Sequence, residues 1–251
     1  MSPAPPIVLL HAFPLDNRLF DGARSLLSGR RLITPDLRGC GDAGPVEPHD
    51  TPSIALLADD VVAGWDRQGL ESVILGGVSL GGYVALDIVR RHPGRVAGLV
   101  LVDTRSGADD DAGRQRREDV AARADHGDRA TGEDAIAPLL GDGVDGSCRR
   151  ELAAIAHAVP AATVAWLQRA MACRPDADAV LRTVGVPVLV VVGEQDSVTP
   201  VAEAARMAAL VRDGGGSATL VVVPGAGHLT PAEAPAVFVD ALVQWVDEHW
   251  S

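Results

Sequence analysis

The sequence predicts an α/β fold, in which a mostly parallel sheet of about six strands is covered by helices on both faces. Short β-branched apolar runs recur along the chain, and each is followed by turn residues and then by a helical pattern. The runs are apolar throughout rather than alternating, as expected of parallel strands buried on both faces. With 251 residues, 47% of them hydrophobic, the chain can bury the core of one such domain and an insertion.

The expected strands are the runs that combine β-branched residues with a turn at their end. In order they are IVLLH at 7–11, RLITP at 31–35, SVILGGV at 72–78, VAGLVLVD at 96–103, VPVLVVVGEQD at 186–196 and ATLVVVPGAGH at 218–228. Four segments between or after them have apolar residues at helical spacing, which predicts amphipathic helices. These helices are expected to begin near Ser53, Leu80, Pro200 and Glu233.

One segment, residues 107–182, interrupts this alternation. Its charged and alanine-rich stretches have helical periodicity but contain no strand-like run. We therefore expect a helical cap inserted at 107–182, with the core formed by residues 1–106 and 183–251. The stretch ADDDAGRQRRED at 108–119 is expected to be a solvated helix face without a function of its own.

The composition excludes several classes of function. A formal charge of −12 disfavours nucleic acid or an anionic membrane as a partner. The absence of lysine excludes a Walker-type phosphate loop, and no nucleotide or other cofactor is expected. The three cysteines lack the spacing of a metal or redox site, so we expect no metal and a reducing, cytoplasmic location. The first residues have neither the basic start nor the long apolar run of a signal peptide.

The stretch GVSLG at 77–81 stands where a strand turns sharply into a helix, and it matches the pattern G-x-S-x-G. In such a turn Ser79 takes a strained conformation with positive φ, and glycines two places before and after it avoid clashes. Because a serine hydroxyl is a weak nucleophile, it needs a base, an acid that orients the base, and donors for the oxyanion. The alternative is an ordinary glycine-rich connection between a strand and a helix.

The required partners follow in the order Ser, Asp, His. Asp196 and His228 each come just after an apolar strand. Loops at the carboxyl ends of parallel strands meet along one edge of a sheet, so the three residues can converge there. Two alternatives stay open: Asp196 could cap the next helix, and His228 could be an ordinary loop residue. Asp103, which also ends a strand, could replace Asp196 as the orienting acid.

The stretch LLHAFPLD at the end of the first strand predicts the oxyanion-binding loop. If the chain turns sharply at Ala12 and Phe13, the backbone amide of Phe13 can face Ser79. With the Leu80 amide at the start of the following helix, it would form an oxyanion hole. The His11 side chain is expected to be a structural hydrogen-bonding group beneath this loop rather than a catalyst.

Taken together, these blocks resemble the α/β-hydrolase fold superfamily, and more narrowly its small esterases, 3-oxoadipate enol-lactonases and cofactor-free haloperoxidases. The likeness covers almost the whole chain and rests on HAFPLD, PDLRGCGD, GVSLGGYVAL, RRHPGRVAGLVLVDTR, VPVLVVVGEQDSVTP and PGAGHLTP, which follow the family order. The resemblance implies that Ser79 attacks an acyl carbon, His228 transfers the proton, and Asp196 fixes the imidazole ring. It also implies that the amides of Phe13 and Leu80 hold the oxyanion.

The sequence departs from the family in three places. The common HG of the oxyanion loop is HA, the common GDS is GDA at 41–43, and the residue before the nucleophile is Val78. The methyl group of Ala12 is expected to narrow the oxyanion turn, because it disfavours φ values that glycine permits. The family usually begins with an extra antiparallel hairpin, whereas this sequence enters the strand before HAFP almost at once. We therefore expect an all-parallel sheet in the order 2-1-3-4-5-6, with the cap after the fourth strand.

The substrate pocket is expected between cap and sheet, and to be small to medium and apolar. Its candidate lining residues are Val78, Trp166 and Met171, together with Phe13 and Leu80; Trp166 could instead belong to the core of the cap. The sequence shows no cluster of cap arginines that would indicate a dicarboxylate substrate. This favours a general carboxylic ester, lactone or thioester as the substrate.

Three functions remain open from the sequence. The first is a metal-free serine hydrolase that acts through an acyl-enzyme, as a monomer or a homodimer. The second is a biosynthetic tailoring enzyme or perhydrolase that uses the same oxyanion site. The third is a small-molecule receptor whose cap closes on its ligand.

Overall fold

A computed structural model describes residues 4–27, 29–47 and 49–250; residues 1–3 and 251 of the expected core lie outside it. A six-stranded sheet runs in the order β2-β1-β3-β4-β5-β6, and every neighbouring pair is parallel. This confirms the fold class and the strand order expected from the sequence. The strands are β1 (Ile7–Leu10), β2 (Leu32–Ile33), β3 (Val73–Val78), β4 (Val96–Val102), β5 (Val188–Gly193) and β6 (Ala218–Val223).

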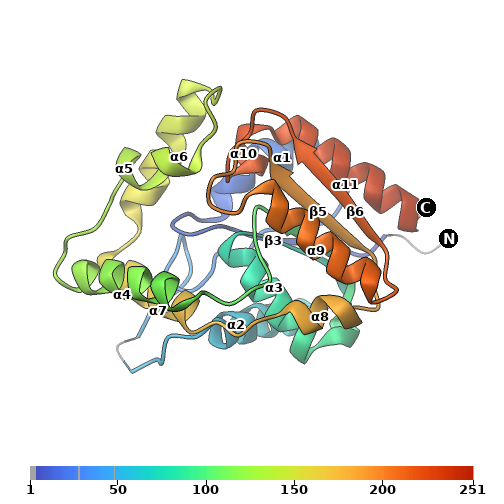
Figure 1. Ribbon diagram of the computed structural model, residues 1–251, viewed down its shortest axis with the longest axis horizontal. Coiled ribbons are helices and arrows are strands. Elements are labelled where there is room, and N and C mark those ends of the chain that lie inside the picture. The colour runs from blue at the N-terminus through green and yellow to red at the C-terminus, as the bar shows by residue number, and fades with distance from the viewer. Residues whose placement is uncertain (1–3, 28, 48, 251) are drawn as a thin grey trace.

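The apolar strands bury both of their faces because successive side chains point in opposite directions. In β1, Val8 and Leu10 face one layer of helices, whereas Ile7 and Leu9 face the other. The first layer contains α2 (Ile54–Arg67), α3 (Leu80–Arg91) and α9 (Val201–Asp213), and the second contains α1 (Asp21–Leu26) and α11 (Pro235–Trp250). Figure 1 shows the sheet between these two layers. Each fully buried Val, Leu or Ile side chain stabilises the fold by roughly 1.5–3 kcal/mol.

The helices begin and end largely where the sequence indicates. Ser53 caps α2, since its side chain accepts a hydrogen bond from the Leu56 amide. Helix α9 follows Pro200 and stops at Gly214. The last helix, expected from Glu233, is α11, which starts at Pro235, and the short α10 (Thr230–Glu233) precedes it. The 3₁₀ helix η1 (Asn17–Phe20) and the short α1 were not predicted, because they are too short to show a helical period.

Between β4 and β5 the chain forms a series of helices, and all but the last of them stand to one side of the sheet (Figure 1). These are α4 (Asp111–Asp125), α5 (Glu133–Ile136), η3 (Ala137–Leu139), α6 (Gly146–Ala158), α7 (Ala161–Ala172) and α8 (Asp178–Thr183). Helix α4 packs against α7, and α5 against α6. Helix α8 packs instead against α9 of the core, so the cap boundaries 107 and 182 stay predictions.

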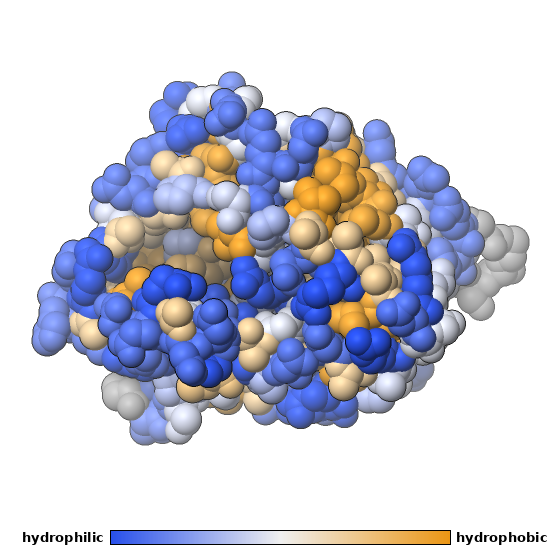
Figure 2. Space-filling view, in the orientation of Figure 1, coloured by the Kyte–Doolittle hydropathy of each residue, from blue (hydrophilic) through white to orange (hydrophobic). Residues whose placement is uncertain are grey.

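Figure 2 shows a hollow between α4 on one side and α5 and α6 on the other, partly apolar inside and surrounded by hydrophilic side chains. The carboxyl ends of the strands lie at this edge of the core. Among the described helices, none is both long enough and apolar enough to cross a membrane.

Candidate active site

Ser79 lies between β3 and α3 in the turn that the sequence predicts. Its φ of 50° and ψ of −109° are rare for a residue with a side chain, and such a conformation costs on the order of 1–3 kcal/mol. Two hydrogen bonds hold it: the Ser79 amide donates to the Val102 carbonyl at 3.0 Å, and the Thr104 hydroxyl donates to the Ser79 carbonyl at 2.8 Å. The neighbouring strand β4 therefore fixes the strained turn.

The glycines around Ser79 are required by space. A Cβ atom on Gly77 would lie 2.1 Å from the backbone of Gly81, and one on Gly81 would lie 2.2 Å from the Leu10 carbonyl oxygen. A Cβ on Gly82 would meet the Thr104 side chain at 2.4 Å. Because the first two contacts are with backbone atoms, no side-chain rotation can relieve them. Close approach of α3 to the sheet thus explains the glycine pattern.

Three side chains from separate loops meet at this turn. The Ser79 Oγ lies 2.9 Å from His228 Nε2, and His228 Nδ1 lies 2.8 Å from Asp196 Oδ2. The side chains of His228 and Asp196 are buried, with exposed fractions of 3% and 0%. The backbone amide of His228 donates to the Leu139 carbonyl at 2.6 Å, so the cap helps to position the histidine loop. The structure therefore brings together the three residues that the sequence predicts as a catalytic triad.

Asp196 is held as a charged hydrogen-bond acceptor. The amides of Val198 and Thr199 donate to its Oδ1 at 2.8 and 2.9 Å, and the Thr199 hydroxyl donates to its Oδ2 at 2.6 Å. Burial alone would raise the pKa of Asp196, but the hydrogen bonds and charge of His228 and the bonds from Thr199 lower it below its usual value. An ionised Asp196 directs the Nδ1 proton of His228 toward itself and leaves Nε2 free as an acceptor.

Asp103, the alternative acid, lies close by but performs a different task. Its carboxylate accepts hydrogen bonds from the Gly193 amide at 3.0 Å and from the amide and hydroxyl of Thr230, both at 2.9 Å. It makes no hydrogen bond with the His228 ring in the described part of the chain. Burial raises the pKa of Asp103 to about 7. Asp103 therefore ties the loops after β5 and β6 together, whereas Asp196 contacts the histidine.

The predicted oxyanion loop lies beside Ser79. Neither the Phe13 amide nor the Leu80 amide donates a hydrogen bond to another described residue, so both are free for a ligand. His11 lies beneath the loop: its Nε2 accepts from the Leu37 amide at 2.9 Å, and its Nδ1 is 3.0 Å from the Ala12 carbonyl. Burial lowers the pKa of His11, which favours the neutral ring with its proton on Nδ1.

The narrowing of the loop at Ala12 stays a prediction, but the strain of a positive φ is not found at this residue. Ala12 does not have a positive φ, because among the described non-glycine residues only Ser79 and Asp103 do. The alanine therefore occupies the turn without the strain that a left-handed backbone would cause.

A cavity of about 350 Å³ opens above Ser79 and His228. Met171 lines it, as expected. Phe13 also lines it, but Val78, Leu80 and Trp166 do not. Val78 and Leu80 are buried in the two core clusters, and the Trp166 indole N–H donates to the Asp50 carbonyl at 3.1 Å. These three predictions are corrected: strand alternation turns Val78 away from the cavity, Leu80 packs into the core, and Trp166 fastens α7 to a core loop. The lining consists of Phe13, Ser79, Tyr83, Arg105, Asp109, Gly113, Arg116, Arg117, Val120, Leu139, Gln168, Met171, Val198 and His228.

The polar part of this lining was not predicted from the sequence. Residues 108–119 were expected to be a solvated face, yet Gly113, Arg116 and Arg117 reach the cavity, as does Val120 directly after them. These four have the spacing i, i+3, i+4 and i+7, which marks one helix face. The spacing could have shown that both arginines share a face, but not that this face covers Ser79. In the described ranges, no three His, Cys, Asp or Glu side chains are grouped to hold a metal ion.

Comparisons with known proteins agree with this architecture. The model of the Alpha/beta hydrolase family matches residues 7–241. The pimeloyl-[acyl-carrier protein] methyl ester esterase of Neisseria meningitidis serogroup B (strain H44/76) is 32% identical over 95% of this chain and 92% of its own. For some other curated relatives, the match spans only about a third of the relative's length.

Two solved structures show the same fold. A thermophilic esterase from Thermogutta terrifontis, solved with malate bound, has a TM-score of 0.91 and 31% identity, covering 99% of this chain and 91% of the other. The enol-lactonase from Burkholderia xenovorans LB400 has a TM-score of 0.81 and 22% identity, covering 98% and 92%. By its sequence match and its fold, the chain belongs to the alpha/beta hydrolase family.

Proposed function

We propose that this chain is a serine hydrolase that cleaves a small, largely apolar carboxylic ester, lactone or thioester through an acyl-enzyme. The observation that supports it most is the continuous series of contacts from Ser79 Oγ through the His228 ring to Asp196, at 2.9 and 2.8 Å. These contacts lie at the base of a cavity. A hydroxyl, a base and an orienting acid in this order are what nucleophilic catalysis by serine requires.

The proposed reaction begins with His228 Nε2 taking the proton from Ser79 Oγ as the oxygen attacks the acyl carbon. The negative charge that develops on the carbonyl oxygen is stabilised by the free amides of Phe13 and Leu80. His228 then gives its proton to the departing alcohol or thiol, while Asp196 stabilises the imidazolium. Water, activated by the same histidine, releases the acid and restores Ser79.

The cavity limits the size of the substrate. Its volume of about 350 Å³ suits a small molecule rather than a polymer. Apolar side chains of Phe13, Leu139 and Met171 lie inside it, and the partly exposed Val120 and Val198 stand at the lining's outer edge. The relatives named as esterases support a hydrolase with this kind of substrate.

Replacing Ser79 with alanine tests the proposal. With p-nitrophenyl acetate and butyrate as substrates, Ser79→Ala should lower kcat/KM on the order of 10⁴-fold or more, because the proposed acyl-enzyme forms on the Ser79 hydroxyl. The exposed Ser25→Ala is the matched control and should keep the wild-type rate. Equal rates for wild type and Ser79→Ala would contradict acyl transfer and leave the tailoring or receptor alternatives.

The location and assembly of the protein are further parts of the proposal. Cys40, Cys148 and Cys173 are all unpaired, which supports a reducing, cytoplasmic compartment. Burial raises the pKa of Cys40 to about 12, so this thiol stays protonated and unreactive. A monomer or homodimer remains a prediction.

A further inference from the structure

The cavity above Ser79 contains more positive charge than an apolar ester requires. Arg105, Arg116 and Arg117 line it, against a single acidic residue other than the buried triad, Asp109. Asp109 is already paired twice, with Arg117 Nε and with Arg174 at 2.7 Å. Its charge is therefore matched within the protein, and Arg105 and Arg116 are left over. This local excess contrasts with the formal charge of −12 on the whole chain.

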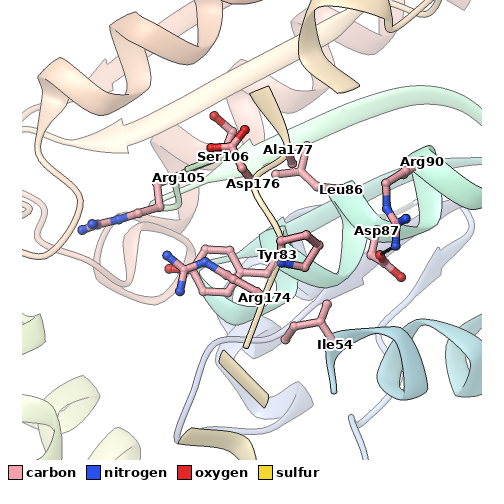
Figure 3. A pocket seen from close by; sticks show the side chains of 11 residues that line it. Ile54, Tyr83, Leu86, Asp87, Arg90, Arg105, Ser106, Arg174, Asp176 and Ala177 are labelled. Carbon is pink, nitrogen blue, oxygen red and sulfur yellow. Dashed lines mark hydrogen bonds and ion pairs between the residues drawn. The ribbon is translucent and has the colours of Figure 1, made fainter. Parts of the chain in front are cut away.

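Arg105 is held next to the triad without a carboxylate partner. It follows β4, and its guanidinium donates to the carbonyl oxygen of Val198, whose amide in turn binds Asp196. Its Nε is buried and has no hydrogen-bond partner, and no ion pair forms with it in the described part of the chain. Figure 3 shows its side chain extending away from Asp176 and Arg174. Arg105 thus lines the cavity with N–H donors that no described residue accepts.

Arg116 is the second unpaired cation of the cavity. It lies on the face of α4 that also presents Gly113, Arg117 and Val120. Other arginines of this helix have an aspartate partner: Arg114 pairs with Asp111, Arg117 with Asp109 and Arg123 with Asp128. For Arg116, the described residues offer neither a hydrogen bond nor an ion pair. Its charge is therefore free to act on a molecule that enters the cavity.

We propose that Arg105 and Arg116 form an anion-binding part of the cavity, which selects esters that also bear a carboxylate, such as the half-esters of small dicarboxylic acids. The inference rests on the proposed hydrolase function and keeps its ester bond, but it gives the substrate a charged end, which the sequence did not indicate because these arginines come together only in the folded chain. A planar guanidinium offers paired N–H donors that match the two oxygens of a carboxylate. One end of the substrate would bind the arginines while its ester carbonyl faces Ser79. The neighbouring apolar side chains would contact the carbon chain between the two groups.

Two pairs of nearly isosteric esters test this selection. Monomethyl succinate is compared with methyl 4-methylpentanoate, where an isopropyl group replaces the carboxylate on the acyl side. Butyrylglycolate is compared with isobutyl butyrate, where the same change is made on the alcohol side. Hydrolysis is followed in a pH-stat for wild type, Arg105→Gln, Arg116→Gln, Arg116→Lys and Arg114→Gln. Arg114 is the matched control, because it is on α4 but outside the cavity lining.

For at least one pair, the wild type should favour the anionic ester in kcat/KM. Arg105→Gln and Arg116→Gln should each lower this preference by about tenfold, since each removes a charge-assisted interaction. Arg116→Lys should retain part of it, Arg114→Gln all of it, and 0.5 M salt should weaken it. A wild type that favours the neutral ester in both pairs, or a preference equal in all variants, would overturn the inference.

A binding measurement separates this inference from the proposed hydrolase function. Succinate should raise the Tm of the Ser79→Ala protein, and adding Arg116→Gln should remove most of that increase. If wild type hydrolyses no ester but succinate stabilises it through the arginines, the hydrolase proposal fails and the anion site stands. If neutral esters are hydrolysed and succinate changes no Tm, the anion site fails and the hydrolase proposal stands.

Discussion

The two walls of the cavity, the rim of the sheet and the inner face of the cap, are built in different ways. At the rim, backbone geometry and buried hydrogen bonds fix Ser79, Asp196 and His228, and the residues involved lie within short motifs at the strand ends. At the cap, Asp109 pairs with Arg117 of α4, eight residues away, and with Arg174 after α7, 65 residues away. The proposed chemistry is thus encoded in local motifs, whereas the cap wall depends on a contact between residues distant in the sequence.

The two walls meet at Tyr83 and Arg174. Tyr83 lies one turn after Ser79 in α3, and the Arg174 guanidinium stacks over its ring at 4.3 Å (Figure 3). Arg174 is buried and pairs with Asp109, which also holds Arg117. Through this series of contacts, the nucleophile helix is fastened to the wall of the cap. The effect of a substitution in one wall on rate or stability can therefore be compared with the effect of a substitution in the other.

The largest difference is expected between two aspartates of the rim. Asp196→Asn should lower kcat on the order of 10³- to 10⁴-fold, because an amide in that place favours the wrong tautomer of His228. Asp103→Asn should lower it only about tenfold, since it shifts the loops of Gly193 and Thr230 but leaves the acid in contact with His228. Steady-state rates with p-nitrophenyl butyrate measure both. The reverse ranking would make Asp103 the functional acid.

A smaller but still large effect is expected from the glycines of the nucleophile turn. Gly77→Ala should lower the free energy of unfolding by about 3 kcal/mol or more, because its Cβ would meet the Gly81 backbone at 2.1 Å. Gly94→Ala is the matched control, since no atom lies within 4 Å of the added Cβ. Urea unfolding followed by circular dichroism measures the difference. Similar stabilities for the two variants would show that α3 can move away from β3.

The rim could be predicted from sequence because each of its requirements leaves a local trace. Close backbone contact requires Gly77 and Gly81, and continuous apolar runs mark strands that are covered on both faces. The right-handed crossover rule then gives the strand order, which brings the three loops to one edge. The sequence favours Asp196 over Asp103 as the acid that orients the histidine but does not decide between them, because both residues follow a strand. Only the structure shows that Asp196 is the one in contact with His228.

The cap wall could not be predicted, because nothing local distinguishes its paired residues from its free ones. Arg114 and Arg116 lie two residues apart in one charged stretch, yet the first pairs with an aspartate and the second faces the cavity. Trp166 was expected in the cavity because large aromatic side chains often line pockets. Its N–H instead finds a carbonyl oxygen at Asp50, more than 100 residues away. Which side chains form pairs and which face the cavity depends on how the cap packs against the core. The helical periodicity of the sequence does not specify that packing.

The smallest expected effect is on the pH dependence of the free energy of unfolding. It tests the cap wall alone. The Arg174 and Arg117 guanidinium groups more than offset the effect of burial and lower the pKa of Asp109 to about 2 from the ordinary 3.8. The unfolded chain therefore takes up a proton near pH 4, while the folded protein does so only near pH 2. The stabilisation that ionised Asp109 contributes is fully present above about pH 4 and is lost as the pH falls toward 2.

Asp109→Asn should accordingly lower the free energy of unfolding by about 2 kcal/mol at pH 7, and by progressively less as the pH falls below 4. Asp111→Asn is the matched control, because its side chain is 99% exposed on the same helix and such surface pairs contribute little. Urea unfolding at pH 7, 4 and 3 measures both variants. A constant difference between wild type and Asp109→Asn would mean that the ion pairs of the cap wall do not stabilise it. Its arginines would then have to be held by packing on Tyr83 and α7 alone.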